Sequence, residues 1–213
     1  MSDASADFES LEKQAHAASL GMWVFVASEF LFFAGFFVLY AAYRVEHPRG
    51  FGVGVETNTL AYGTVNTAVL LVSSYTVALG VHALRNGRAR AAAGLTALTV
   101  LFGGCFLAIK TAEYLHHFRE GIFPGGAGDF FVQHPDPGTK IFYTLYFCMT
   151  GLHAIHVTVG MGILAWLAAR VLRGSVTPYA PHPLALGAVY WHLVDLVWIF
   201  LWPLFYLVPG NVR

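Results

Sequence analysis

Long runs of apolar residues alternate with short polar breaks along this 213-residue chain. A helix needs roughly 20 apolar residues to cross about 30 Å of hydrocarbon. Runs of sufficient length occupy residues 20–43, 59–84, 91–115, 140–170 and 184–208. The pattern therefore predicts an all-α protein, an integral membrane bundle of about five transmembrane helices.

The apolar runs divide the chain into a short tail and one membrane domain. Residues 1–19 are predicted to form a cytoplasmic, partly disordered N-terminal tail, because they contain several acidic residues and a single lysine, Lys13. That balance is the opposite of the basic start of a signal peptide. Residues 20–210 are predicted to form a five-helix membrane domain, in which we find no repeat at a solenoid period.

Arginines indicate the orientation of the bundle. Arg85, Arg88 and Arg90 lie at one short break and Arg170 and Arg173 at another, without acidic residues in either. Cytoplasmic loops carry an excess of lysine and arginine. With five spans these breaks lie on the same side as the N-terminus, so we expect the N-terminus in the cytoplasm and Arg213 outside.

Composition agrees with a membrane protein and excludes a nucleic acid as partner. Hydrophobic residues make up 57% and charged residues 11% of the chain, whereas soluble domains average about 25% charged residues. The mean hydropathy is +0.60. Twelve basic residues balance twelve acidic ones, which leaves no basic surface for nucleic acid.

Several ionisable side chains fall inside the predicted spans, where such groups are costly and are functional candidates by default. Lys110 and Glu113 are three residues apart near the end of the third run, so we expect a local ion pair with the lysine reaching towards the headgroups. The complete set is Glu29, Lys110, Glu113, His153, His156, His192 and Asp195.

Glu29 lies well inside the first run, among aromatic and aliphatic residues. Apolar surroundings favour the neutral carboxylic acid over the carboxylate. Two roles are open for this side chain. It is either a neutral carboxyl group hydrogen-bonded to a neighbouring helix or a group that exchanges protons.

Two further pairs are spaced to share helix faces: His153 with His156, and His192 with Asp195. Their positions along the runs place all four near the depth of Glu29. Polar groups turned to hydrocarbon lose their hydrogen bonds at a cost of several kcal/mol each. We therefore expect these buried side chains to face one another or Glu29 in a network that fixes helix packing.

Histidines and carboxylates can also bind metals, and histidines on two helices can hold a haem. A di-iron bundle site takes a Glu-x-x-His motif on each of two helices, and this pairing of motifs is absent from the sequence. We expect no metal or haem to be bound by this chain. A stand-alone membrane metal or haem enzyme and a small proton-coupled carrier are the alternative classes.

Motifs in each apolar run together resemble the cytochrome c oxidase subunit III family, from about Leu20 to Val208. Glu29 lies in a stretch similar to the family's helix with a buried, carbodiimide-reactive glutamate, and it matches that glutamate. Asn66-Thr67 and Glu113-Tyr114 are similar to the family's Asn-Thr and Glu-Tyr pairs. The strongest matches are Thr150-Gly151-Leu152-His153-Ala154-Ile155-His156-Val157 and Tyr190-Trp191-His192-Leu193-Val194-Asp195-Leu196-Val197-Trp198.

The resemblance implies a non-catalytic subunit of a haem-copper respiratory oxidase in a bacterial plasma membrane. Such a subunit binds subunit I, which carries the haem and copper, together with other oxidase subunits and membrane phospholipid. It stabilises subunit I and supports proton uptake and oxygen reduction, with cytochrome c or quinol as electron donor. Longer members have seven helices, whereas this chain resembles the five-helix form. It also resembles subunit-III-like proteins associated with nitric oxide reductase, which is the alternative.

Overall fold

A computed structural model describes the backbone of residues 2–208 and the side chains of residues 13–208. Within that range the chain is helical, without strands. The spanning helices are α1, α3, α4, α6 and α7, and shorter segments join or extend them. Their bounds are α1 Ser2–Glu46, α2 Pro48–Thr57, α3 Leu60–Arg85, α4 Ala89–Arg119, α5 Asp129–Gln133, α6 Pro137–Leu172, α7 His182–Trp202 and the π-helical turn η1 Pro203–Leu207.

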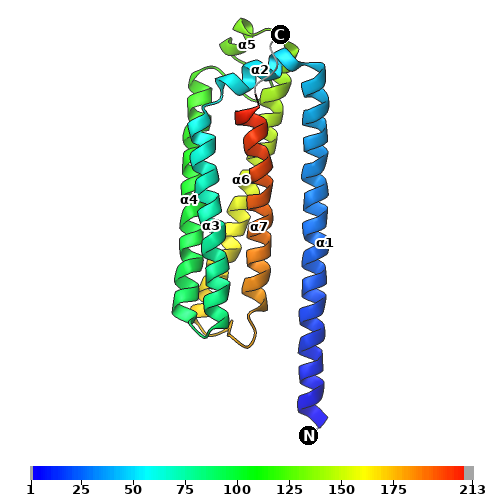
Figure 1. The fold of residues 1–213 in the computed structure, drawn as a ribbon, viewed down its shortest axis with the longest axis vertical. Coiled ribbons are helices and arrows are strands. Elements are labelled where there is room, and N and C mark those ends of the chain that lie inside the picture. The colour runs from blue at the N-terminus through cyan, green and yellow to red at the C-terminus, as the bar shows by residue number, and fades with distance from the viewer. Residues whose placement is uncertain (1, 209–213) are drawn as a thin grey trace.

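The prediction of five membrane-spanning helices is confirmed. The stretches long and apolar enough to cross a membrane are Lys13–Glu46, Leu60–Arg85, Ala89–Arg119, Pro137–Leu172 and His182–Leu207. The breaks predicted at 44–58 and 116–139 contain the short helices α2 and α5. Both are too short to span, and both lie at the same end of the bundle (Figure 1).

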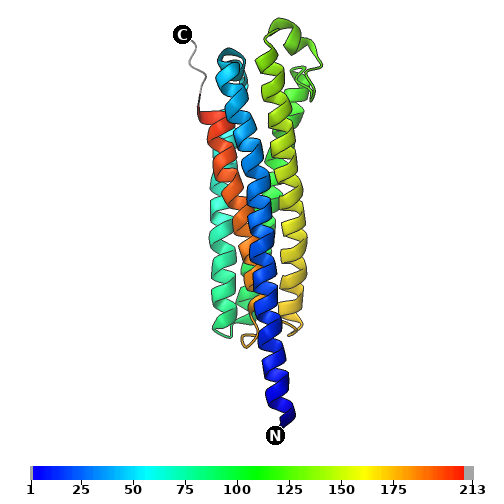
Figure 2. The ribbon, with the colours of Figure 1, turned by 90° about the vertical axis from the view of Figure 1, so that its right-hand side faces the viewer.

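The two ends of the bundle differ. The N-terminus, the α3–α4 turn and the α6–α7 loop lie at one end, called here the N-terminal end (Figures 1 and 2). The helices α2 and α5 and the turn η1 lie at the other, called the capped end. The arginine-rich breaks are therefore on the same side as the start of α1, while Arg213 lies outside the described residues.

Helix α1 extends into the predicted N-terminal tail. Helix α1 begins at Ser2 and continues without a break to Glu46. The segment 2–19 contains neither glycine nor proline, and five of its residues are alanine, the residue that favours the helix most strongly. Helix formation by these residues needs no apolar run, which is why the hydropathy pattern missed it.

Local residue choices set the helix ends. Proline has no backbone N–H and its ring clashes with the preceding helical turn, so a helix ends before it. Pro48 separates α1 from α2 in this way. Asp136 caps α6, since its carboxylate accepts a 2.7 Å hydrogen bond from the amide of Gly138, and Pro137 occupies the first turn. Gly87, with φ of +75°, ends the α3–α4 turn in the left-handed conformation.

Aromatic side chains fill the centre of the bundle formed by α3, α4, α6 and α7. Trp191 of α7 is fully buried and lies against two glycines. A methyl group at Gly103 of α4 or Gly160 of α6 would come within 2.8 or 2.9 Å of its ring. These glycines therefore allow three helices to close around one indole.

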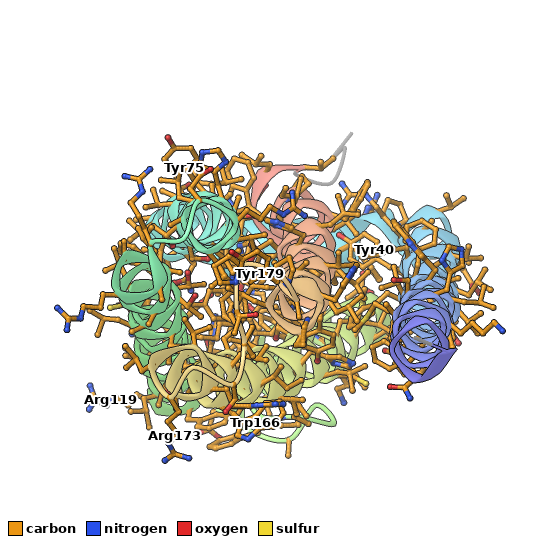
Figure 3. All side chains as sticks on the ribbon, turned by 90° about the horizontal axis from the view of Figure 1, so that it is seen from below. Tyr40, Tyr75, Arg119, Trp166, Arg173 and Tyr179 are labelled. Atoms are coloured by element: carbon orange, nitrogen blue, oxygen red, sulfur yellow. The ribbon has the colours of Figure 1, made fainter. Side chains whose placement is uncertain are left out.

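Helix α1 lies at the edge of this bundle, against α6 and α7 (Figure 3). The fully buried Tyr40 lies between α1 and the rest of the bundle. The outward face of α1 is apolar and exposed, and it includes Trp23, Leu31 and Val38. Such a surface suits lipid or another membrane helix.

Candidate functional site

Glu29 and His156 form a polar link between α1 and α6. The carboxyl Oε2 of Glu29 lies 3.0 Å from Nε2 of His156, and both side chains are about one-fifth exposed. Nδ1 of His156 lies 2.9 Å from the carbonyl oxygen of Leu152. The hydroxyl of Tyr190 donates to the carbonyl of His156, which brings α7 to the same place.

This geometry restricts the protonation states of the pair. A carbonyl oxygen can only accept, so Nδ1 of His156 carries a hydrogen. Nε2 then either accepts from a neutral Glu29 acid or donates to its carboxylate as part of an imidazolium. The two states differ by the transfer of one proton along the 3.0 Å contact. The pair can therefore both join helices and exchange a proton.

We expect Glu29 and His156 to be energetically coupled in the folded protein. Glu29→Ala and His156→Ala should each destabilise the chain, and the double variant should lose less than their sum by about 0.5 to 1.5 kcal/mol, the net contribution of one hydrogen bond. The free energy of unfolding of the wild type, both single variants and the double variant, measured in mild detergent, gives the coupling energy. Ser28→Ala is the control, because its exposed hydroxyl bonds only to the carbonyl of Phe25 among the described residues, and strict additivity for Glu29 would contradict the coupling.

Lys110 and Glu113 form the predicted ion pair, but Lys110 does not reach the headgroups. Its ammonium is buried and donates to Oε2 of Glu113 at 3.0 Å and to the hydroxyl oxygens of Tyr146 and Tyr206 at 2.8 Å each. Both tyrosine hydroxyls donate in turn to Oε1 of Glu113, at 2.8 and 2.6 Å. All three ammonium hydrogens thus have acceptors. The network joins α4, α6 and η1 near the capped end.

His153 lies in the centre of the bundle and is not paired with His156. Its ring packs between Trp198, with centroids 5.1 Å apart, and Phe106, 5.4 Å apart. Neither ring nitrogen has a hydrogen bond within the described part of the chain. His156 therefore meets Glu29, as one form of the expected network requires, whereas His153 joins no such network, because α6 turns His156 towards α1 and His153 towards α4 and α7.

Asp195 is also buried, and it does not bond to a histidine. The Ser74 hydroxyl lies beside this carboxyl, but neither carboxyl oxygen has a well-formed hydrogen bond among residues 13–208. His192, three residues earlier, is exposed instead of buried, and its Nδ1 lies 2.6 Å from Oγ of Ser74. Three residues turn a helix by about 300°, so the two side chains point about 60° apart. This difference places Asp195 on the buried face of α7 and His192 just outside it.

Tryptophans and small hydroxyl residues tie α7 to α3, a set that the sequence analysis did not identify. The indole of Trp191 donates to Oγ of Ser73, and that of Trp198 donates to Oγ1 of Thr67, both at 3.0 Å. The signal in the sequence was the position of both tryptophans well inside the last run, since buried indoles need an acceptor.

Candidate metal ligands do not converge. Within the part of the chain that the structure describes, there is no group of three or more histidine, cysteine, aspartate or glutamate side chains that could hold a metal ion. The candidate side chains singled out in the sequence instead separate into the Glu29–His156 link, the Lys110–Glu113 network, the core side chains of His153 and Asp195, and the exposed His192.

Comparison with known proteins identifies the family. The family model described as cytochrome c oxidase subunit III matches residues 9–209. The chain is 29% identical to quinol oxidase subunit 3 of Bacillus spizizenii over 89% of this chain and 86% of the relative. It is 28% identical to cytochrome bo(3) ubiquinol oxidase subunit 3 of Pseudomonas putida, over 89% and 84% of the two chains. Cytochrome c oxidase subunit 3 of Gallus gallus is 30% identical, over 85% of this chain and 66% of the relative.

The match covers all five spans and every candidate site residue described in this subsection, from the Glu29–His156 link to the buried network on η1. The chain belongs to the cytochrome c oxidase subunit III family.

Proposed function

We propose that this subunit III works without a redox centre of its own, bound in the membrane to the haem-copper subunit I of a respiratory oxidase and to its other subunits. One observation carries the proposal. The ionisable side chains inside the spans mostly bond within the chain, as in the closed network around Lys110 and Glu113. Their arrangement serves helix packing, as expected of a supporting subunit.

A second part of the proposed role concerns protons. The Glu29–His156 link lies at the edge of the bundle, between α1 and α6, and is partly exposed. It holds one proton that either partner can carry, as its hydrogen bonds require. We propose that the subunit stabilises subunit I and supports proton uptake during oxygen reduction, with this link as the group that exchanges protons.

The proposed orientation places the N-terminal end of the bundle in the cytoplasm of a bacterial cell. The arginines at 85, 88, 90, 170 and 173 all belong to the two breaks at that end, which supports this orientation through the excess of positive charge in cytoplasmic loops. The C-terminus would then lie outside the plasma membrane.

A bound phospholipid fits one groove of this surface. A hollow of about 280 Å³ between α1, α6 and α7 is lined mainly by apolar side chains, among them Met22, Phe25 and Leu186. Trp166 lines the same hollow and packs against the guanidinium of Arg170, 4.9 Å from its ring centre. We propose that an acyl chain occupies the hollow with an anionic headgroup beside Arg170.

Affinity purification of the tagged chain from its native membranes tests the proposed function. We expect a haem-copper subunit to co-purify with oxygen-reducing activity. The chain separated from that complex should contain no stoichiometric haem, copper or iron. About one metal ion per isolated chain, or a wild-type chain that purifies without a haem-copper subunit, would contradict the proposal. Reduction of nitric oxide but not oxygen by the complex would favour the alternative kinship.

A further inference from the structure

Helix α7 lies between α1 and α3 and contacts both (Figure 1). A groove runs along the face of α7 between these two neighbours. It consists of two adjoining hollows that share Val189 and His192. The hollow towards α1 has a volume of about 290 Å³ and includes Trp23 and Leu196. The hollow towards α3 has a volume of about 250 Å³ and is lined also by Ala78, Val81, Arg85, Ala185 and Ala188.

His192 lies in this groove in the inner part of the last membrane-spanning stretch, where we expect hydrocarbon around the bundle. It is ten residues from the start of α7, or about 15 Å along the helix, close to half the thickness of a hydrocarbon core of about 30 Å. Nδ1 bonds to Ser74, and no hydrogen bond of Nε2 is found among residues 13–208. An imidazole nitrogen that faces hydrocarbon without a hydrogen bond costs free energy. We therefore expect a group bound in the groove to form a hydrogen bond with Nε2.

The depth of His192 decides between a lipid and a protein occupant. Acyl chains carry no hydrogen-bonding group, and the polar groups of a phospholipid stay near the membrane surface. Of these two occupants, only a spanning protein segment brings a hydrogen-bonding group to the depth of Nε2 of His192. The hollow between α1, α6 and α7 differs in this respect, because its lining has no imidazole or charged side chain.

The rest of the lining suits a helix. Ala78, Ala185 and Ala188 are small, and small residues allow the backbones of membrane helices to approach closely. Arg85 is exposed where the groove reaches the N-terminal end. It is eleven residues from Ser74, the partner of His192, so the two polar positions are about 16 Å apart, or three helical turns.

We propose that this groove docks a transmembrane helix of another oxidase subunit. That helix presents a hydrogen-bonding side chain to Nε2 of His192 and, about three turns nearer the N-terminal end, an acidic or carbonyl acceptor to Arg85. The inference rests on the proposed function, because the oxidase complex supplies the helix. It adds the surface of this chain that makes the contact and the chemistry of the partner.

Matched tryptophan substitutions test the groove in the purified complex. Ala78 in the groove and Ala97 on α4 are both exposed and lie seven and eight residues from the helix ends that flank the α3–α4 turn. Ala78→Trp should lower the amount of this chain retained by the haem-copper subunit after detergent washing about tenfold, while Ala97→Trp should leave retention unchanged. Equal helical content of both variants by circular dichroism excludes a failure to fold.

His192 provides the chemical test. His192→Leu should weaken retention about threefold to tenfold, as the loss of one interhelical hydrogen bond predicts, and His192→Gln should restore part of it. A photo-crosslinking amino acid at position 78 should capture a protein subunit. Crosslinks to lipid alone, or unchanged retention in Ala78→Trp and His192→Leu, would overturn the inference. So would a co-purifying quinone that is lost in His192→Leu without loss of retention.

The wild-type complex separates failure of this inference from failure of the proposed function. A wild-type chain that does not co-purify with a haem-copper subunit refutes the proposed function. A wild-type chain that does, together with groove variants that bind equally well, refutes only the docking surface.

Discussion

Lys110→Met is expected to destabilise the chain by about 3 to 5 kcal/mol, the cost of leaving one member of a buried ion pair without its partner. The Glu113 carboxylate would keep two tyrosine donors but lose the ammonium that lies 3.0 Å from it. Thermal unfolding of the purified chain in mild detergent measures the loss. The C-terminal turn η1 should loosen first, because Tyr206 joins it to α4 through this network.

Two further variants show whether the loss comes from the buried charge. Lys140→Met removes an exposed lysine from α6 and should change stability little. Lys110→Met combined with Glu113→Leu removes both charges and should be more stable than Lys110→Met alone, since apolar replacement of a whole buried pair is often tolerated. A double variant that loses the sum of both single effects would contradict the ion-pair explanation.

Trp198→Ala should cost about 3 to 5 kcal/mol through the cavity left by a fully buried indole. The indole packs on His153 and Phe106 and donates to Thr67, so the substitution removes contacts with α3, α4 and α6 at once. Denaturant unfolding in mixed micelles measures the change. The hydrogen bond alone is a minor part, and Thr67→Val should cost roughly 1 kcal/mol, the usual net contribution of one such bond.

Trp166 is the matched control for Trp198. It is 58% exposed on α6, where its ring faces the surroundings of the bundle. Trp166→Ala should therefore change the free energy of unfolding of the isolated chain by far less than Trp198→Ala. Equal losses at the two positions would mean that the centre of the bundle is not packed around Trp198.

The polar residues inside the spans connect the helices of the bundle to one another. Apolar attraction does not distinguish helix from lipid, so packing and hydrogen bonds must hold the helices together. Trp191 and Trp198 tie α3 to α7, the Lys110 network ties α4 to α6 and η1, and the Glu29–His156 link ties α1 to α6. Helix α1 is tied to the capped end as well, where Tyr40 and Arg44 donate to the carbonyl oxygens of Leu204 and Val208.

The amino-acid sequence by itself determined the five spans, the placement of both arginine-rich breaks on the side of the N-terminus, and the Lys110–Glu113 ion pair. Spans follow from run length against the thickness of hydrocarbon, and a pair three residues apart on one helix needs no tertiary information. The family motifs were likewise present in the sequence, since they are linear. Residues 2–19 form a helix through intrinsic propensity, which a search for apolar runs does not detect.

Only the tertiary structure decided which polar residues meet. His153 and His156 share a spacing, as do His192 and Asp195, yet in each pair one side chain lies in the core and the other at or near the surface. Helical spacing fixes the angle between two side chains, but the rotation of the whole helix against its neighbours decides which of them faces the core. That rotation is set by the fit of large side chains such as Trp191 against Gly103 and Gly160, residues far apart in sequence and brought together only by the packed bundle.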